Sequence, residues 1–510
     1  MNKIAILALA GISSLANAQK EKPNIIFIVT DDQHRNEFNF LEEGVVDGKA
    51  INYSPNIDRL SSEGVILDNY YITSPICTPS RYTILTGNYA SRATNEGFLE
   101  DQRKYNQTNV SWNTDITPNT PNIASLMKAN GYFTGGVGKN HVIEFNEWIR
   151  IPRDADPRDP KIKAQLEKNH EYQIETYKSI GFDFATSIYK GNLPSTYPIE
   201  LEDHNTDWIV KGALEFFDLA ADKEEPFFLY FATTVSHGPD RMGTKYKGDP
   251  LVTPAGFLEK ELDDMPSREN ITERIKARGL DDRAADVLWL DDAVGALLVK
   301  LEEMGELKNT VIFYIDDHGV EGGKVTLYQG GALSPSFVWG PEYITSGIRS
   351  SQLVSNIDMV PTVVDLCDID VSDDYPMDGK SILPILKGED KVIHESLYLE
   401  IGATRAVIMD GWKYIAFRTP EEREKKYSAM GKKATHINDQ PGGRGSETPA
   451  MAKYPHYYEK DQLYNVIEDP DEQTNLYNDK ENKKRIEALK KEMKKYLYQL
   501  PGGFGEIKVE

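Results

Sequence analysis

The sequence predicts an α/β fold in which a large, mostly parallel sheet is sandwiched by helices. Short apolar runs of strand length alternate along the chain with segments of helical periodicity, which is the pattern of a parallel sheet. The first run, residues 24–30, is apolar almost throughout, as expected of a strand covered on both faces. Beyond about residue 390 the runs are short and closely spaced, which indicates a smaller C-terminal α+β subdomain with an antiparallel sheet.

The elements of the large domain follow in order from local signals. Ser54 and Pro55 begin a helix with an N-cap and a proline in its first turn, and Gly64 ends it. Apolar residues at helical spacing predict one long helix over residues 280–304, for which we expect no chemistry. The remaining expected strands are 65–73, 132–137, 226–232 and 309–315, and the remaining helices are 79–87, 120–131 and 206–219.

The domain organisation is predicted to be a signal peptide at 1–18, a large N-terminal domain at 19–390 that carries the candidate site residues described below, and a C-terminal subdomain at 391–510. In the last of these we expect short strands at 397–401, 405–409 and 412–417 and a charged amphipathic helix at 483–497. Asp410 and Gly411 would form a two-residue hairpin turn. Residues 142–200 show no clear periodicity, so we expect loops and short helices there, and residues 421–458 are long and polar.

Composition restricts the partners of the chain. Its 510 residues allow one large and one smaller domain, or two to three ordinary domains. The formal net charge of −23 makes nucleic acid and anionic membrane surfaces poor partners. An anionic substrate would be repelled by the chain as a whole, so its site would need a local concentration of Lys, Arg and His.

The N-terminus has the pattern of a signal peptide. Lys3 supplies the positive region, residues 4–15 are mostly apolar, and Ala16-Asn17-Ala18 matches a cleavage site. The mature chain would begin near Gln19, and we expect an exported protein, periplasmic or secreted. No later stretch has the apolar length of a membrane span.

Cys77 is one of only two cysteines in the chain. Pro79 suits the first turn of a helix, which places Cys77 just before a helix N-terminus, where backbone N–H groups favour an anion. Arg81 lies on the first turn and can point at the same anion. Taken alone, a free cysteine is usually a small buried hydrophobe, and a disulfide with Cys367 is the other alternative.

Charged residues follow the predicted strands directly. Asp31 and Asp32 follow the first, and residues 316–318 (Asp-Asp-His) follow the strand at 309–315. Ligands of open α/β sheets gather at the carboxyl ends of strands, where paired carboxylates could hold a cation. Lys139 and His141 would share one face of an extended segment, and His237 follows another core strand. Each of these features, taken singly, could also be a solvated turn or surface pair.

Together, these motifs resemble the type I sulfatases of the alkaline phosphatase superfamily, and bacterial polysaccharide sulfatases among them. The segment Cys77-Thr78-Pro79-Ser80-Arg81 is similar to their Cys-x-Pro-x-Arg signature. The resemblance extends from the first strand to the C-terminal helix and is weakest over 142–200 and 421–458. The chain departs from the family pattern at Asn140, where an aromatic residue is usual, and at Asp316, where serine is usual.

The resemblance implies an alkaline phosphatase-like fold and a specific set of site residues. Cys77 would be converted to formylglycine (3-oxoalanine) by a formylglycine-generating or anaerobic sulfatase-maturating enzyme. Three carboxylates favour Ca²⁺, and the histidine keeps Mn²⁺ and Zn²⁺ as alternatives. The implied metal ligands are Asp31, Asp32, Cys77, Asp317 and His318.

The resemblance also implies a mechanism. The hydrated aldehyde attacks sulfur, Lys139 and Lys324 stabilise charge on the sulfuryl oxygens, and His237 protonates the departing alcohol. His141 and Arg81 orient the formylglycine, whose second hydroxyl then expels sulfate. The implied catalytic residues are Cys77, Arg81, Lys139, His141, His237 and Lys324.

The expected substrate is a sulfated polysaccharide or an oligosaccharide from it, bound by Lys139, His237, Lys324, His34 and Arg35. His204, Asp240, Arg241 and residues 421–458 are further candidates for contacts with sugar. Two alternatives are a phosphonate or phosphate ester hydrolase of the same superfamily and a non-catalytic glycan-binding protein. Cys77 disfavours a phosphatase, whose nucleophile would be Ser or Thr, and the filled catalytic positions argue against a binding protein.

Overall fold

The computed structural model describes residues 22–509 apart from 146, 194–196, 240–243 and 373–374. The predicted signal peptide, Asp240 and Arg241 lie outside the described residues. No helix within the described ranges has both the length and the apolar character that crossing a bilayer requires.

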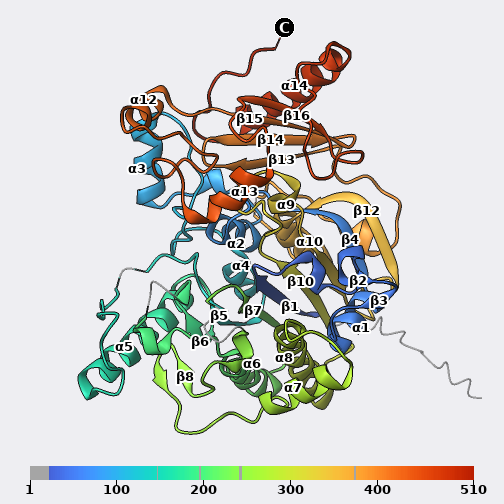
Figure 1. Cartoon of the computed structure of the whole chain (residues 1–510). Coiled ribbons are helices and arrows are strands. Elements are labelled where there is room, and N and C mark those ends of the chain that lie inside the picture. The colour runs from blue at the N-terminus through green and yellow to red at the C-terminus, as the bar shows by residue number, and fades with distance from the viewer. Residues whose placement is uncertain (1–21, 146, 194–196, 240–243, 373–374, 510) are drawn as a thin grey trace, which may run out of the picture.

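A large twisted sheet forms the centre of the molecule (Figure 1). Within the described residues it has eight strands, and each strand runs parallel to its neighbours except β11, which is antiparallel to both. The mostly parallel sheet predicted from sequence is confirmed. In spatial order the strands are β12 (Ile348–Ser355), β4 (Val65–Tyr71), β11 (Ser336–Trp339), β10 (Thr310–Asp316), β1 (Asn24–Asp31), β7 (Phe227–Ser236), β5 (Phe133–Lys139) and β6 (Phe184–Tyr189).

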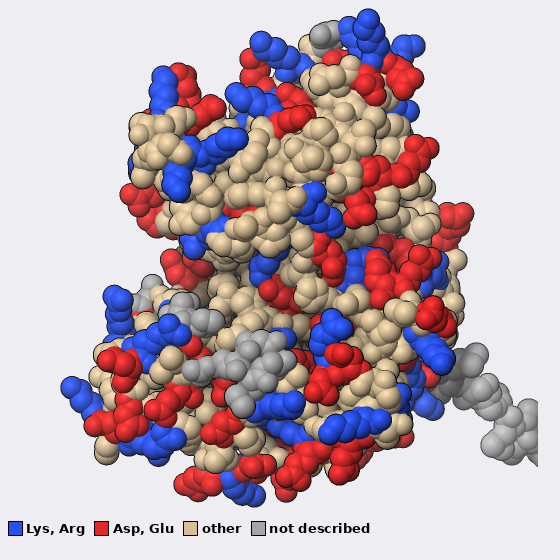
Figure 2. Space-filling model, in the orientation of Figure 1, with Lys and Arg blue, Asp and Glu red and all other residues tan. Residues whose placement is uncertain are grey.

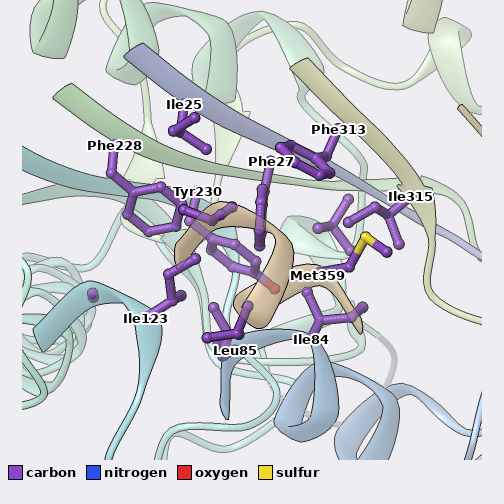
Figure 3. Packing of buried hydrophobic residues seen from close by; sticks show 14 of the residues in the cluster. Ile25, Phe27, Ile84, Leu85, Ile123, Phe228, Tyr230, Phe313, Ile315 and Met359 are labelled. Carbon is purple, nitrogen blue, oxygen red and sulfur yellow. The ribbon is translucent and has the colours of Figure 1, made fainter. Parts of the chain in front are cut away.

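Two apolar cores cover the two faces of this sheet, because successive side chains of a strand point to opposite faces. On β1, Ile25 and Phe27 enter one core and Ile26 and Ile28 the other. Figure 3 shows the first core, where Phe27, Phe228 and Phe313 from three strands meet Ile84, Ile123 and Met359 from helices. That face is covered by α2 (Cys77–Thr86), α4 (Ile123–Ala129) and α10 (Met359–Leu366), and the other by α1 (Pro55–Glu63), α6 (Thr206–Ala221), α7 (Arg268–Ala277) and α8 (Ala284–Glu303).

A second, antiparallel sheet lies beyond the large one, at the top of Figure 1. Its order is β13 (Ser396–Ile401), β14 (Thr404–Met409), β15 (Trp412–Phe417) and β16 (Asp461–Asn465), and α14 (Lys483–Gln499) packs against it. Asp410 and Gly411 both have positive φ, 51° and 74°, as the predicted two-residue hairpin turn between β14 and β15 requires. The antiparallel C-terminal sheet and its helix are therefore confirmed.

Smaller elements connect and flank these sheets. Among the described residues they are the helices α3 (Glu96–Tyr105), α5 (Pro160–Ser179), α9 (Gln329–Ala332), α11 (Leu383–Leu386), α12 (Glu421–Ala429) and α13 (Thr448–Lys453), and the hairpins β2 (Val45–Val46) with β3 (Lys49–Ala50) and β8 (Val252–Thr253) with β9 (Gly256–Phe257).

The expectation of loops and short helices over residues 142–200 is wrong. This part of the chain contains the 20-residue helix α5 and the edge strand β6. Polar residues occupy much of the buried face of α5, which removes the apolar periodicity on which the prediction depended. Asn169 bonds to both the N–H and the carbonyl of Ile149 (2.7 and 2.8 Å), and Gln173 accepts a bond from Asn140 (3.0 Å).

A buried ion pair joins the second sheet to a loop of the first domain. Lys413 and Glu472 are both fully buried, and their charged atoms lie 2.8 Å apart. Lys413 Nζ also donates to the carbonyl of Leu327 at 2.9 Å. The backbone N–H of Gln329 donates to Glu472. Residues 327–329, which follow Lys324, are thus held in place by the C-terminal subdomain.

Replacing Lys413 by methionine should destabilise the protein by about 3 kcal/mol, because the Glu472 carboxylate would remain buried without its partner. Urea denaturation measures this free energy of unfolding. The matched control is Lys495→Ala, which removes an exposed pair with Glu492 and should cost less than about 1 kcal/mol. Equal effects of the two substitutions would contradict the structural role of the buried pair.

Candidate active site

Adjacent strands bring the predicted residues to one edge of the large sheet. Asp31 ends β1, Asp316 ends β10 and Lys139 ends β5, while His237 directly follows β7. These four strands are neighbours in the order β10, β1, β7, β5, so their carboxyl ends meet. The site therefore lies at the edge where parallel sheets collect ligands.

Cys77 is the first residue of α2, one position further into the helix than its sequence suggests. Its side chain is buried, and Sγ lies 3.4 Å from His318 Nε2 and 3.8 Å from Asp31 Oδ1. Both Cys77 and Cys367 are free thiols, so the disulfide considered above is wrong. The N-terminus of α2 begins at Cys77, and the helix dipole favours negative charge there.

Three carboxylates and three basic side chains pair with one another around Cys77. Lys139 Nζ lies 2.6 Å from Asp31 Oδ2, and Lys324 Nζ lies 2.6 Å from Asp32 Oδ2. The fully buried Arg81 donates from Nε to Asp317 Oδ2 at 3.1 Å, and its Nη2 lies 3.6 Å from Asp31 Oδ1. The fold thus gathers six charges of alternating sign in a space largely closed to water.

These pairs keep the carboxylates ionised despite their burial. Burial opposes ionisation of Asp31, but Lys139, His237 and Arg81 hold its pKa well below the usual value. Burial also opposes ionisation of Asp32, but Lys324 and His318 lower the pKa of Asp32 to about 2. Two ionised carboxylates therefore face Cys77 at neutral pH.

The side chains around Cys77 include two groups of potential metal ligands. One group of ligand atoms comes from Asp32, Cys77 and His318 and another from Asp31, Cys77 and Asp317, and the atoms of each group lie within 4.8 Å of one another. Three carboxylates with an imidazole and the side chain at position 77 form a shell that a divalent ion can occupy. Burial disfavours the charged imidazole, but Asp317 and Cys77 raise the pKa of His318 to about 10, so an ion would have to displace its proton.

The two other predicted histidines differ in their surroundings. His237 Nδ1 bonds to the carbonyl of Gly238 at 2.7 Å, and its Nε2 lies 3.7 Å from Asp32 Oδ2. Burial, with Lys139, lowers the pKa of His237. Burial and Lys139 also lower the pKa of His141 well below its usual value. Both imidazoles are thus neutral near pH 7, and His237 presents Nε2 to the site.

An open pocket of about 290 Å³ leads to this cluster. Asp32, His34 and Lys324 line it together with Ser446 and Pro449, which belong to the long polar segment 421–458. The Arg35 guanidinium is not among the lining groups, because it pairs with Glu43 at 2.6 Å. His204 is buried, with Nδ1 bonded to Thr234 Oγ1 at 2.8 Å. Figure 2 shows acidic and basic side chains gathered near the centre of this face.

The two departures from the family pattern have structural explanations. Asp316 is fully buried and accepts bonds from Ser334 Oγ (2.8 Å) and the Gln33 N–H (3.1 Å). Burial and Asp317 raise its pKa well above the usual value, so as a neutral group it connects the loop after β1 to the segment before β11. Asn140 Oδ1 accepts the N–H groups of Val142 and Ile143 (3.2 and 2.8 Å), which shapes the turn that carries His141.

Several residues that support the site are not identified by the sequence analysis. Tyr230 OH accepts a bond from Arg81 Nη1 at 3.2 Å, and Ser80 Oγ bonds to the backbone carbonyl of Asp317. Glu37 accepts a bond from Ser236 Oγ at 2.7 Å, beside His237. Tyr230 lies in an apolar strand, and the sequence around it does not distinguish it from an ordinary core residue. Ser80 is the variable position of the cysteine motif, so its side-chain partner could not be inferred.

Curated relatives are similar to this chain along most of their length. An N-acetylgalactosamine-6-sulfatase of Mus musculus is 26% identical over 415 residues, covering 75% of this chain and 70% of its own. An N-acetylglucosamine-6-O-sulfatase of Bacteroides thetaiotaomicron is 25% identical over 449 residues, covering 76% and 75%. A solved protein in complex with its substrate, D-glucosamine-2-N,6-O-disulfate, has a TM-score of 0.59 at 20% identity, covering 94% and 98%. At that identity the solved structure shows a shared fold.

Family models identify the chain itself. The Sulfatase model matches residues 23–369, and the model of the N-sulphoglucosamine sulphohydrolase C-terminal region matches residues 318–428. The first match spans more than half of the chain and contains every residue of the charged cluster around Cys77. The protein therefore belongs to the sulfatase family and is a sulfuric ester hydrolase.

Proposed function

We propose that this sulfatase removes sulfate from a sulfated glycan or its oligosaccharides, with Cys77 converted to formylglycine and a divalent cation, calcium, in the site. The observation that carries the proposal is the balanced cluster of charges around Cys77. Asp31, Asp32 and Asp317 are matched by Arg81, Lys139 and Lys324. A divalent cation would leave two net positive charges, which suits a sulfate ester in a chain whose net charge is −23.

The surroundings of Cys77 support its conversion. The side chain at this place lies 3.8 Å from Asp31 Oδ1 and 3.4 Å from His318 Nε2, among the charged groups that would act on a hydrated aldehyde. A hydrated aldehyde offers two hydroxyl groups, one to attack sulfur and one to expel the sulfate afterwards. Conversion requires a formylglycine-generating or anaerobic sulfatase-maturating enzyme in the cell.

Asp31, Asp32, Asp317, His318 and position 77 would hold the cation. Bound there, it would supply Lewis-acid activation of the attacking oxygen and of the sulfuryl group. Manganese and zinc remain alternatives because of His318.

The protein's own side chains have separate roles in the reaction. Lys139 and Lys324 stabilise the sulfuryl oxygens in the transition state, and Arg81 fixes Asp317 and the start of α2 through its buried bonds. His141 is neutral and orients position 77. His237 holds its proton on Nδ1 against the carbonyl of Gly238, so its Nε2 must take up a proton before it can pass one to the departing alcohol.

Sulfated sugar is the substrate class that the surroundings of the site favour. The relatives named above include enzymes for sulfated amino sugars, and the pocket presents His34 and Ser446 as hydrogen-bonding groups beside Lys324. Arg35 remains a prediction as a sugar contact. The signal-peptide pattern favours an exported enzyme, periplasmic or secreted, that meets glycans outside the cytoplasm.

Peptide mass spectrometry of protein from a host with the maturation enzyme should show that Cys77 has lost its sulfur. The variant Cys77→Ala should lose at least about a thousandfold in kcat, because the nucleophile is removed. The control is Cys367→Ala, the second buried cysteine, which should keep its activity. Fully active protein with an intact Cys77 thiol would sink the formylglycine proposal.

Removal of divalent ions with a chelator should lower activity at least about tenfold and lower the thermal midpoint, because bound ion stabilises the native state. Added calcium should restore both quantities, and elemental analysis of the purified enzyme should find calcium. Chelator already saturated with calcium is the control. Unchanged activity in enzyme shown to contain no divalent ion would contradict the cation site.

Sulfate release from a panel of sulfated glycans and their oligosaccharides tests the substrate class. The enzyme should act on sugar sulfates, and His237→Ala should reduce kcat for them about a hundredfold. The same variant should affect 4-nitrocatechol sulfate much less, because a phenolate leaves without protonation. His456→Ala, at a partly exposed histidine paired with Glu459, serves as control. Turnover of small aryl sulfates alone would refute the glycan proposal.

A further inference from the structure

A second cavity lies next to the catalytic pocket and is larger. Its volume is about 760 Å³, within the range of about 300–1,000 Å³ usual for ligand sites. It is formed by the loop after β1, the β2–β3 hairpin, and the segment from the end of α7 to the start of α8. None of the residues assigned to catalysis above lines it.

The two spaces share His34 as a lining residue. This side chain lines both of them and is about half exposed, with Nδ1 held by Glu321 at 3.2 Å. A second link runs through Glu37, which lines the larger cavity and bonds to Ser236 of the catalytic pocket at 2.7 Å. A chain-like ligand with one end at Lys324 can therefore continue past His34 without leaving the surface.

The carboxylates of the larger cavity are already engaged by the protein. Asp286 accepts the backbone N–H groups of Lys245 and Tyr246 (2.8 and 3.0 Å), and the Lys245 ammonium lies 3.5 Å away. Burial raises the pKa of Glu37, whose carboxyl bonds to Ser236. Asp281, the third carboxylate of the cavity, pairs with Arg283 at 3.0 Å. Each of these acids therefore has a partner in the protein, which reduces its repulsion toward an incoming anion.

Two cations of the cavity, by contrast, lack acidic partners among the described residues. Lys49 is exposed on the β2–β3 hairpin and forms no ion pair there. The Arg278 guanidinium stacks on the ring of Tyr53 at 3.4 Å and donates only to the carbonyl of Arg274, at 3.3 Å. A guanidinium held flat by a ring keeps donors for an oxyanion and loses little freedom on binding.

We propose that this second cavity is an extended subsite for the neighbouring sugars of an acidic oligosaccharide, with Lys49 and Arg278 binding an anionic group, sulfate or carboxylate, on one of them. The inference rests on the proposed glycan substrate and deepens it. The catalytic pocket of about 290 Å³ takes the sugar that loses sulfate, and the larger cavity selects chains over single sugars.

The test compares substrates of two lengths on variants of the complete enzyme. One substrate is a sulfated monosaccharide, and the other is an oligosaccharide that carries the same sulfated sugar and further anionic groups. Lys49→Glu and Arg278→Gln should each lower kcat/KM for the oligosaccharide about tenfold, the effect of losing one charge-assisted contact. For the monosaccharide, kcat/KM should stay within about twofold.

Lys104→Glu is the control, because Lys104 is exposed on α3, far from the hairpin in Figure 1, and the substitution changes the net charge by the same amount as Lys49→Glu. Equal losses on both substrates, or no loss on the oligosaccharide, would overturn the subsite. Absence of any glycan turnover by the unaltered enzyme would instead overturn the proposed function. A loss for oligosaccharides with sulfated neighbours but not for those with only carboxylated ones would identify sulfate as the bound group.

Discussion

The structure depends on the pairing of charges that have been removed from water. Asp31 and Asp317 are buried at the ends of neighbouring strands, and an unpaired buried carboxylate would cost several kcal/mol. Arg81 spans the two, because it bonds to Asp317 and approaches Asp31 from the first turn of α2. The same contacts that make the burial tolerable fix Cys77 relative to both acids. Stability and positioning of the nucleophile therefore have one physical origin.

Much of the fold could be predicted because local signals agree with the final packing. Apolar runs mark β1, β7 and β10, Pro55 and Gly64 mark the ends of α1, and Asp410 with Gly411 marks the β14–β15 turn. The side chain of Ser54, the predicted N-cap of α1, makes no capping bond. The predictions of secondary structure failed where the buried side chains of an element are polar. Asn169 and Gln173 face the interior of α5 by bonding to other parts of the chain, so hydrophobic spacing there carries no signal. The edge strand β12 is similarly polar. The strand β11 is short, and it can be recognised as a strand only from its pairing with the strands on either side.

A site residue could be predicted where its role follows from the sequence immediately around it. Asp31, Cys77, Lys139 and Asp317 each stand at a strand end or helix start, and the parallel order of the strands brings them together. Ser446 and Pro449 reach the catalytic pocket from a segment more than a hundred residues beyond Lys324. The sequence makes the segment 421–458 a candidate for sugar contacts, but no local pattern identifies which of its residues reach the pocket, because only the docking of the second sheet on the first brings them near.

That docking has a consequence for how the protein can diversify. The catalytic groups stand on strands of the large sheet, whereas one wall of the pocket belongs to the segment that contains α13 and another space is bounded by the exposed β2–β3 hairpin. Both segments are loops and short elements on the surface, which tolerate sequence change better than buried strands. Substrate selectivity can therefore change during evolution while the reaction is conserved. Proteins with this fold can become specific for new sugars through sequence changes in these surface segments.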